Sequence, residues 1–154
     1  MNKLNKTCGT PLTRDTISSL LKSNDWSVRE AALNACIGRD VPSEFIELGM
    51  NDSYCAVRKA AMNACVGRDI PLSIIECGLK DDCRGVMEAA MKACIGREIP
   101  LETIERWLDH DILNCRIVAM NACVGKDIPI ETIERWLNSN NPYFEAAAMN
   151  ARKG

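Results

Sequence analysis

The chain has 154 residues, of which 47% are apolar and 26% charged, and its formal net charge is −2. This composition is typical of a folded globular protein, and such a charge provides no field that attracts nucleic acid or an anionic membrane. No stretch approaches the roughly 18 apolar residues of a membrane-spanning helix, and the opening sequence MNKLNKTCGTPLTRD lacks the apolar core of a signal peptide. We therefore expect a cytoplasmic protein that makes no membrane contact.

One phrase recurs along the chain at a fixed spacing. Its copies read ALNACIGRDVP, AMNACVGRDIP, AMKACIGREIP and AMNACVGKDIP, and their cysteines lie 29 residues apart, at Cys36, Cys65, Cys94 and Cys123. A fixed period of this length predicts a repeat architecture. We expect an N-terminal tail at 1–10 and a single repeat domain at 11–154. Its repeats are predicted at approximately 11–38, 42–67, 71–96, 100–125 and 129–154.

Each repeat is predicted to contain two short helices. The first begins at a proline, whose missing N–H is harmless at the first helical position; these prolines are Pro42, Pro71, Pro100 and Pro129, with Pro11 two residues early. The second contains VREAALNAC or its equivalent and ends at a glycine such as Gly38, which suits the left-handed position after a helix. Two such helices cannot bury their faces alone, so the core must come from stacking of repeats.

The segment DWSVREAALNACIG at 25–38 resembles the second-helix signature of bacterial HEAT-like repeats of the phycobilisome-lyase type. That signature has an Asp, then Val-Arg, then paired alanines, then a large apolar residue and a glycine. The resemblance covers about residues 11–154. It implies an all-α fold, a right-handed αα-superhelix (a HEAT/armadillo-like solenoid) of five two-helix repeats of about 29 residues. It implies no particular activity, because fold does not determine function.

The resemblance also implies a ladder of ion pairs between repeats. Arginines at one position of the second helix commonly bond an acid of the adjacent repeat in HEAT-like proteins. Here Arg29, Arg58 and Arg116 occupy that position, with Asp52 and Asp81 as expected partners. Met87 and Glu145 interrupt the row, so we expect the ladder to be incomplete.

The nine cysteines are too many to leave unexplained. An odd number cannot pair completely within one molecule, and no CxxC motif occurs. The four periodic cysteines should lie on neighbouring helices about 8–10 Å apart, beyond the roughly 7 Å Cα separation that a disulfide allows. We expect them to be reduced and to fill the core. Any redox or metal role then falls mainly to the irregular ones, Cys8, Cys55, Cys77, Cys83 and Cys115.

Two rows of residues are candidates for a binding face. The first is the turn after the second helix, which carries Arg39, Arg68, Arg97 and Lys126. These cations could grip phosphates or carboxylates. Because an acid follows each of them, we favour the alternative that the turn is locally neutral, with each acid capping the next helix or pairing with a neighbouring arginine.

The second row lies on the second helix and is our preferred contact surface. It contains Met62, Asn63, Met91, Lys92, Met120 and Asn121. Methionine adapts to many partners and recurs at binding surfaces, and amides can bond a peptide backbone. The alternative is that methionine packs between repeats and asparagine is merely solvated.

Tryptophans break the repeat near its end. Trp107 and Trp136 stand where Gly49 and Gly78 stood, in nearly identical IERWL copies. Exposed tryptophans contribute strongly to binding, but these two could equally fill the groove between the last two repeats. Both interpretations remain open at this point.

Catalysis has little support in the sequence. The single histidine, His110, lies in a variable Asp-His-Asp loop where we expect a solvated side chain. No phosphate-binding glycine loop, G-x-S-x-G or H-E-x-x-H motif occurs. We expect no catalytic residue, no metal and no cofactor.

We therefore predict a non-enzymatic binding scaffold that presents a curved surface to a protein or peptide. One alternative is sequestration of a small anionic ligand or nucleotide between repeats or protomers. Nucleic-acid binding is a second alternative, and the net charge makes it the least favoured. The last repeat keeps apolar residues, so Phe144, Ala148 and Met149 are candidates for homo-oligomer formation through the C-terminal repeat.

Overall fold

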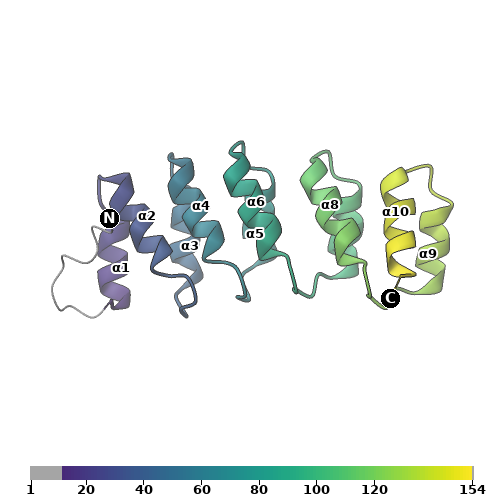
Figure 1. The fold of residues 1–154 in the computed structure, drawn as a ribbon, viewed down its shortest axis with the longest axis horizontal. Helices are drawn as coiled ribbons and strands as arrows, with labels where there is room; N and C mark the ends of the chain where they lie inside the picture. The colour runs from purple at the N-terminus through teal and green to yellow at the C-terminus, as the bar shows by residue number, and fades with distance from the viewer. Residues whose placement is uncertain (1–11, 154) are drawn as a thin grey trace. The chain divides into compact units, whose positions relative to one another are not determined.

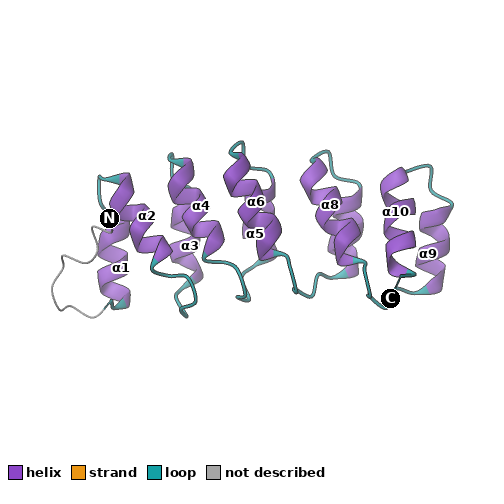
Figure 2. Ribbon diagram, viewed as in Figure 1, coloured by secondary structure: helices purple, strands orange, loops and turns teal. Residues whose placement is uncertain are grey.

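A computed structural model describes residues 12–153, and this part of the chain contains ten helices and no strand (Figure 2). The all-α prediction is confirmed for these residues. The predicted tail at 1–10, Cys8 and Pro11 lie outside them. The helices are α1 Arg14–Leu21, α2 Trp26–Asn34, α3 Ser43–Met50, α4 Cys55–Asn63, α5 Leu72–Leu79, α6 Arg84–Ala93, α7 Leu101–Leu108, α8 Leu113–Ala122, α9 Ile130–Leu137 and α10 Pro142–Ala151. Over the described range, no helix has the length and apolar character needed to span a bilayer.

The helices form two compact units, with the boundary between Ile95 and Gly96. In the first unit, α2, α4 and α6 pack side by side, while α1, α3 and α5 each pack against the helix that follows in the chain (Figure 1). In the second unit, α7 packs on α8, α9 on α10, and α8 on α10. Each unit therefore repeats the same contact, a helix pair whose second helix touches the second helix of the next pair.

The predicted start and stop signals lie at the expected places, with one shift. Pro42 and Pro100 are not the first helical residues; each precedes its helix with an extended backbone, at ψ 142° and 145°. The carbonyl of Pro100 accepts the first helical hydrogen bond, from Ile104 at 3.0 Å. The predicted left-handed glycines are confirmed, with φ between 68° and 74° at Gly38, Gly67, Gly96 and Gly125.

Small side chains recur in the core at fixed positions of the second helices, beside larger buried side chains such as Leu33 and Trp107. Ala32, Ala61, Ala90 and Ala119 are fully buried, and so are Cys36, Cys65 and Cys123. Each of these three thiols donates a hydrogen bond to the carbonyl four residues earlier, at 3.2–3.5 Å. The expectation that the periodic cysteines fill the core is therefore confirmed, and Cys94 is also buried and free.

Two glycines allow the helices of the first unit to approach closely. A Cβ built on Gly49 would lie 2.6 Å from Leu33 Cδ1 and 2.7 Å from Ala61 Cβ. At Gly78 the corresponding distances are 2.7 Å to Met62 Cε and 2.9 Å to Ala90 Cβ. These glycines are notches that receive a large side chain from the preceding helix pair.

Candidate functional site

The preferred methionine and asparagine row does not form a continuous surface. Met62 is fully buried in the Gly78 notch, so the expectation that it contacts a partner is wrong. Met91, Met120 and Asn63 are half-buried, whereas Lys92 and Asn121 are exposed. Exposure along this row depends on which residue faces each methionine, and the period alone does not reveal that.

The charged turns are neutralised by their neighbours where the partners are visible. Arg68 donates to the carbonyl of Val41 and lies 4.0 Å from the Asp40 carboxylate of the preceding turn. Lys126 pairs with Glu98 of the preceding turn in the same way. Arg39 is exposed and Arg97 is half-buried. The pairing alternative therefore holds at Arg68 and Lys126, and this row is not an open cationic strip.

The expected ladder is confirmed in the first unit. Arg29 donates to Asp52 through Nε at 2.6 Å and Nη2 at 3.0 Å, and Arg58 donates to Asp81 at 2.7 and 3.0 Å. The bonds from Arg29 hold the pKa of Asp52 below its usual value, against the effect of burial. For Asp81 burial is the largest influence and opposes ionisation, yet the bonds from Arg58 and the Cys83 N–H together outweigh it and the pKa is lowered.

The ladder changes its chemistry in the second unit. His110 and Ser139 occupy the positions that Asp52 and Asp81 hold in the first. Arg116 donates instead to the carbonyls of His110 and Asp111, at 2.6 and 2.7 Å. Its guanidinium lies 4.4 Å from the centre of the Tyr143 ring. The side-chain carboxylate that joins successive helix pairs in the first unit is replaced here by a serine.

Both repeat-breaking tryptophans are buried, at 0% and 1% exposure for Trp107 and Trp136. Neither ring is therefore an exposed binding anchor, and the groove-filling interpretation fits Trp136, which contacts residues of both of the last two helix pairs. Trp136 has a second role, because its indole Nε1 donates to Glu105 at 3.0 Å. Its ring also meets the edge of Phe144, with centroids 5.9 Å apart.

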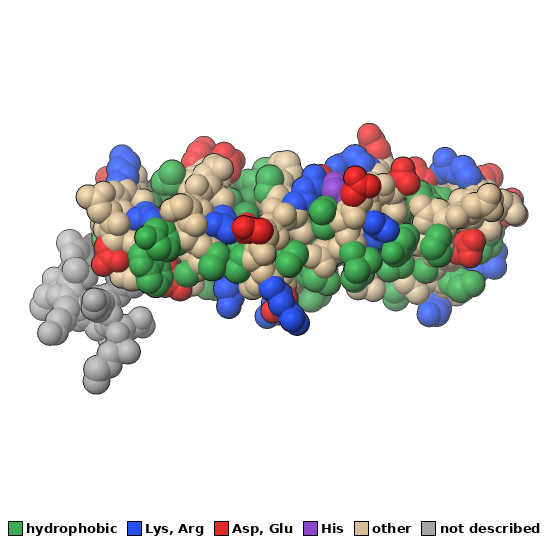
Figure 3. All heavy atoms as spheres, turned by 90° about the horizontal axis from the view of Figure 1, so that it is seen from above, with side chains coloured by type: hydrophobic (Ala, Val, Ile, Leu, Met, Phe, Trp, Pro, Cys, Tyr) green, Lys and Arg blue, Asp and Glu red, His purple; other side chains and the backbone are tan. Residues whose placement is uncertain are grey.

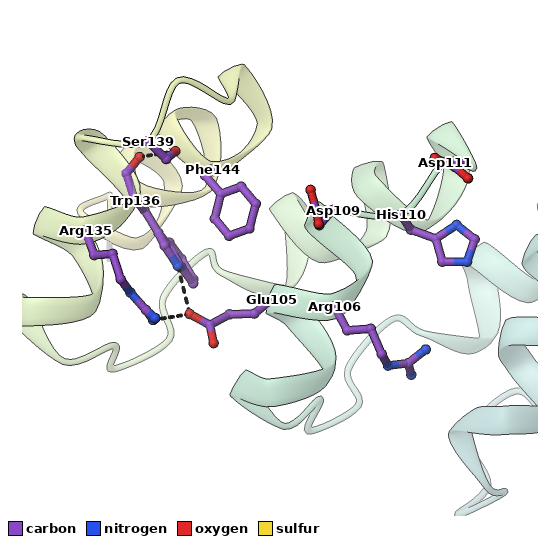
Figure 4. Close-up of a pocket in the computed structure, with 9 residues that line it drawn as sticks. All are labelled: Glu105, Arg106, Asp109, His110, Asp111, Arg135, Trp136, Ser139 and Phe144. Carbon is purple, nitrogen blue, oxygen red and sulfur yellow. Dashed lines mark hydrogen bonds and ion pairs between the residues drawn. The ribbon is translucent and has the colours of Figure 1, made fainter.

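An open groove of about 570 Å³ lies beside Trp136 in the second unit (Figure 4). Helix α7 contributes Glu105 and Arg106, α9 contributes Arg135 and Trp136, and α10 contributes Phe144. The remaining lining residues are Asp109, His110, Asp111 and Ser139. Figure 4 shows the Arg135 guanidinium and the Trp136 indole both directed at Glu105, which they bind. The floor of the groove is thus fixed by two hydrogen bonds to one carboxylate.

The loop 109–111 separates this groove from a second hollow of about 350 Å³, which contains Arg116 and Tyr143. His110 is anchored in the loop, because its Nδ1 accepts the Ile112 N–H at 3.0 Å. In the neutral ring the proton must therefore be on Nε2, where it can be donated to a ligand. Seen from above in Figure 3, the histidine (purple) lies on the surface among acidic and basic side chains.

The acidic residues of the groove differ in whether a cation pairs with them. Glu105 is already paired with Arg135, whereas Asp109 and Asp111 are exposed. Within residues 12–153, neither of these two carboxylates forms an ion pair. The loop thus adds two exposed carboxylates to a lining that also contains Glu105 and two arginines, Arg106 and Arg135.

Sequence reasoning missed this groove, although its signal was present. Three residues of its wall depart from their counterparts two repeats earlier. Trp136, Ser139 and Phe144 stand where Gly78, Asp81 and Val86 stand in the first unit. Only the tryptophan was recognised from sequence as a break in the repeat, because the three residues are not adjacent in sequence and only the fold brings them together.

Two further expectations concern thiols and the last helix. Burial raises the pKa of Cys36, and it raises the pKa of Cys123 to about 11. Among the described residues, no three His, Cys, Asp or Glu side chains are grouped to hold a metal ion. Of the residues expected to support self-association, Ala148 is buried, which excludes it from a contact surface, while Met149 is 57% exposed.

Comparison with protein-family models, with curated protein sequences and with solved structures gave no match to this chain. The function has therefore to be inferred from the chain's own residues.

Proposed function

We propose that this chain is a HEAT-like αα-solenoid that acts as a non-enzymatic binding scaffold, and that the groove beside Trp136 binds a peptide segment of a partner protein. The observation that carries the proposal is the groove itself, which combines an aromatic wall with an acidic rim. Its volume of about 570 Å³ falls within the range of about 300–1,000 Å³ that is usual for ligand sites.

The chemistry of the walls defines the peptide. Phe144 offers a half-buried aromatic surface for an apolar side chain. Asp109 lies beside it and Asp111 lies farther along the same lining, and both carboxylates favour a lysine or arginine next to that apolar residue (Figure 4). The same carboxylates disfavour the small anionic ligand and the nucleic acid that we considered from sequence.

The groove is also prepared for binding before a ligand arrives. Glu105 is held by Arg135 and Trp136, and Ser139 donates to the carbonyl of Trp136 at 2.7 Å. A site whose side chains are already ordered has less entropy to lose on association. Peptide recognition therefore requires little rearrangement of these residues.

The polar groups of the groove are poorly arranged for catalysis. A serine nucleophile needs its hydroxyl bonded to a base. The Ser139 hydroxyl instead donates to a backbone carbonyl, and the His110 Nδ1 is occupied by a backbone N–H. This arrangement supports binding without a chemical step.

Short synthetic peptides test the proposal. We would titrate the full chain with Gly-Ser-flanked Phe-Lys, Phe-Glu and Ala-Lys peptides and follow amide shifts by NMR. The Phe-Lys peptide should perturb residues 109–111 and Phe144 most strongly. The double substitution Asp109→Asn, Asp111→Asn should weaken its binding roughly twofold to thirtyfold, since each exposed ion pair contributes about 0.2–1 kcal/mol.

The matched control is Asp127→Asn, an exposed acid of the same unit outside the groove, which should leave the affinity unchanged. Equal binding of the Phe-Lys and Phe-Glu peptides, or shifts confined to other surfaces, would contradict the proposal.

A further inference from the structure

Two thiols from different helix pairs meet in the first unit. Cys55 is the first residue of α4, and Cys83 is the residue immediately before α6. Helices α4 and α6 pack side by side, and each thiol acts on the pKa of the other, so the two side chains are neighbours. Cys55 is exposed and Cys83 is half-buried, so small molecules can reach the pair.

The packing of neighbouring helices explains this contact. The residue before one second helix lies against the first residue of the preceding second helix. The same step brings Tyr54 onto Trp26, whose rings stack with centroids 5.6 Å apart and an interplanar angle of 15°. Cys83 and Cys55 occupy the equivalent positions one repeat later. Their proximity is therefore a consequence of how α2, α4 and α6 pack.

The surroundings make the two sulfurs unequal. The Val86 N–H at the start of α6, then the Cys55 thiol, and then the Gly85 N–H favour a thiolate and lower the pKa of Cys83. The Cys83 sulfur raises the pKa of Cys55. The neutral Cys83 thiol makes no capping bond to the helix, and ionisation makes the sulfur a stronger acceptor. Arg58 and Asp81 are the nearest charged groups and act in opposite directions on the pair.

We propose that Cys55 and Cys83 form a redox-active dithiol, which low-molecular-weight disulfides oxidise to an intramolecular disulfide linking α4 to α6. The site lies in the first unit, so it is independent of the peptide groove and of the proposed function. Among the described cysteines, only these two and the exposed Cys77 are not buried in the core.

The reaction balances as two exchange steps. The Cys83 thiolate attacks a disulfide RSSR, forms a Cys83–SR bond and expels one RS⁻. Cys55 then loses its proton and attacks the Cys83 sulfur, which forms the Cys55–Cys83 bond and expels the second RS⁻. Two protein thiols are oxidised, one disulfide is reduced to two thiols, and the protons leave with those thiols.

The experiment equilibrates the full chain with oxidised and reduced glutathione at pH 7, quenches it with an alkylating agent and maps the peptides by mass spectrometry. The expected product has lost two hydrogens and carries a Cys55–Cys83 cross-link. Because the cross-link constrains the unfolded chain, the melting temperature of the oxidised protein should be roughly 5–10 °C above that of the reduced protein. Cys83 should also be alkylated faster than the exposed Cys77 at neutral pH.

Variants distinguish this pair from a general reaction of exposed thiols. Cys77→Ser should still form the cross-link, whereas Cys55→Ser should stop at a mixed disulfide of Cys83 with glutathione. The proposal is overturned if the wild-type chain keeps both thiols, holds glutathione at Cys83 without closing the link, or joins either cysteine to another residue. These outcomes are read from the wild-type protein, so they do not depend on the folding of a variant.

Discussion

Replacing Arg58 with methionine tests whether the ladder joins successive helix pairs. Arg58 bonds Asp81 at 2.7 and 3.0 Å and Asp82 at 2.9 Å. It also donates to the carbonyls of Asp52 and Ser53, at 3.0 and 3.1 Å. The chain itself carries a methionine at this register, Met87, so the substitution suits the helix.

The expected cost follows from what the substitution leaves behind. The Asp81 side chain is 8% exposed and that of Arg58 is 15% exposed. Removing one partner of a fully buried pair costs about 3–5 kcal/mol, because the remaining charge is uncompensated. Here the Cys83 N–H still donates to Asp81 at 2.8 Å and water reaches the edge of the pair, so we expect about 2 kcal/mol. That loss should lower the urea midpoint by about 1 M.

A double-mutant cycle isolates the pair from other effects of the substitution. Arg58→Met, Asp81→Ala and the double variant would be unfolded in urea at pH 7. The coupling free energy should be about 1–2 kcal/mol, and Arg58→Lys should lie between wild type and Arg58→Met because lysine cannot make both bonds. A coupling free energy below about 0.5 kcal/mol would refute the reasoning, since the Arg58–Asp81 bonds would then contribute no more than an exposed ion pair.

Two further predictions concern acid and glycine. Folding lowers the pKa values of Asp52 and Asp81. The stability that these two carboxylates give the protein is therefore complete above the unfolded-state pKa of about 4 and is lost as pH falls through the folded pKa values. Urea midpoints should drop below pH 4, and the Asp81 part of this drop should vanish in Arg58→Met. Gly49→Ala should destabilise the protein by about 1–2 kcal/mol in the same assay, because its Cβ would overlap Leu33 and Ala61. The control Gly85→Ala should be neutral or stabilising, because its Cβ meets only the flexible Lys59 side chain at 3.3 Å. Equal effects of the two substitutions would contradict the close helix approach at Gly49.

Much of the fold could be predicted because its signals are local. Apolar spacing, the prolines and the left-handed glycines specify each helix pair within about ten residues of sequence. The burial of Cys36 and its equivalents followed from their place on the inner face, and the Arg29–Asp52 pair followed from the family resemblance. These features depend on one repeat or on its immediate neighbour.

The side-chain environment between helix pairs could not be predicted in the same way. The methionine row has one period and nearly one composition, yet Met62 is fully buried and Met120 is only half-buried. Met62 is accommodated because Gly78 leaves space for it, whereas the second unit has Trp136 at that register. Whether a residue is core or surface is therefore decided by a different residue 16 positions away, and periodicity does not report such pairs.

The positions at which the repeat fails are more informative about function than those at which it holds. At one register the first unit has Gly78, Asp81 and Val86, and there Asp81 is bonded by Arg58. The second unit has Trp136, Ser139 and Phe144, and these three line a single groove. Where the first unit has a glycine, the second has a tryptophan that donates a hydrogen bond to Glu105. A serine stands in place of the ion-pairing carboxylate, and a half-buried phenylalanine stands in place of the buried valine. Departures without a common role need not meet in space. Their convergence on one wall, beside the exposed carboxylates of Asp109 and Asp111, is why we propose a binding site here.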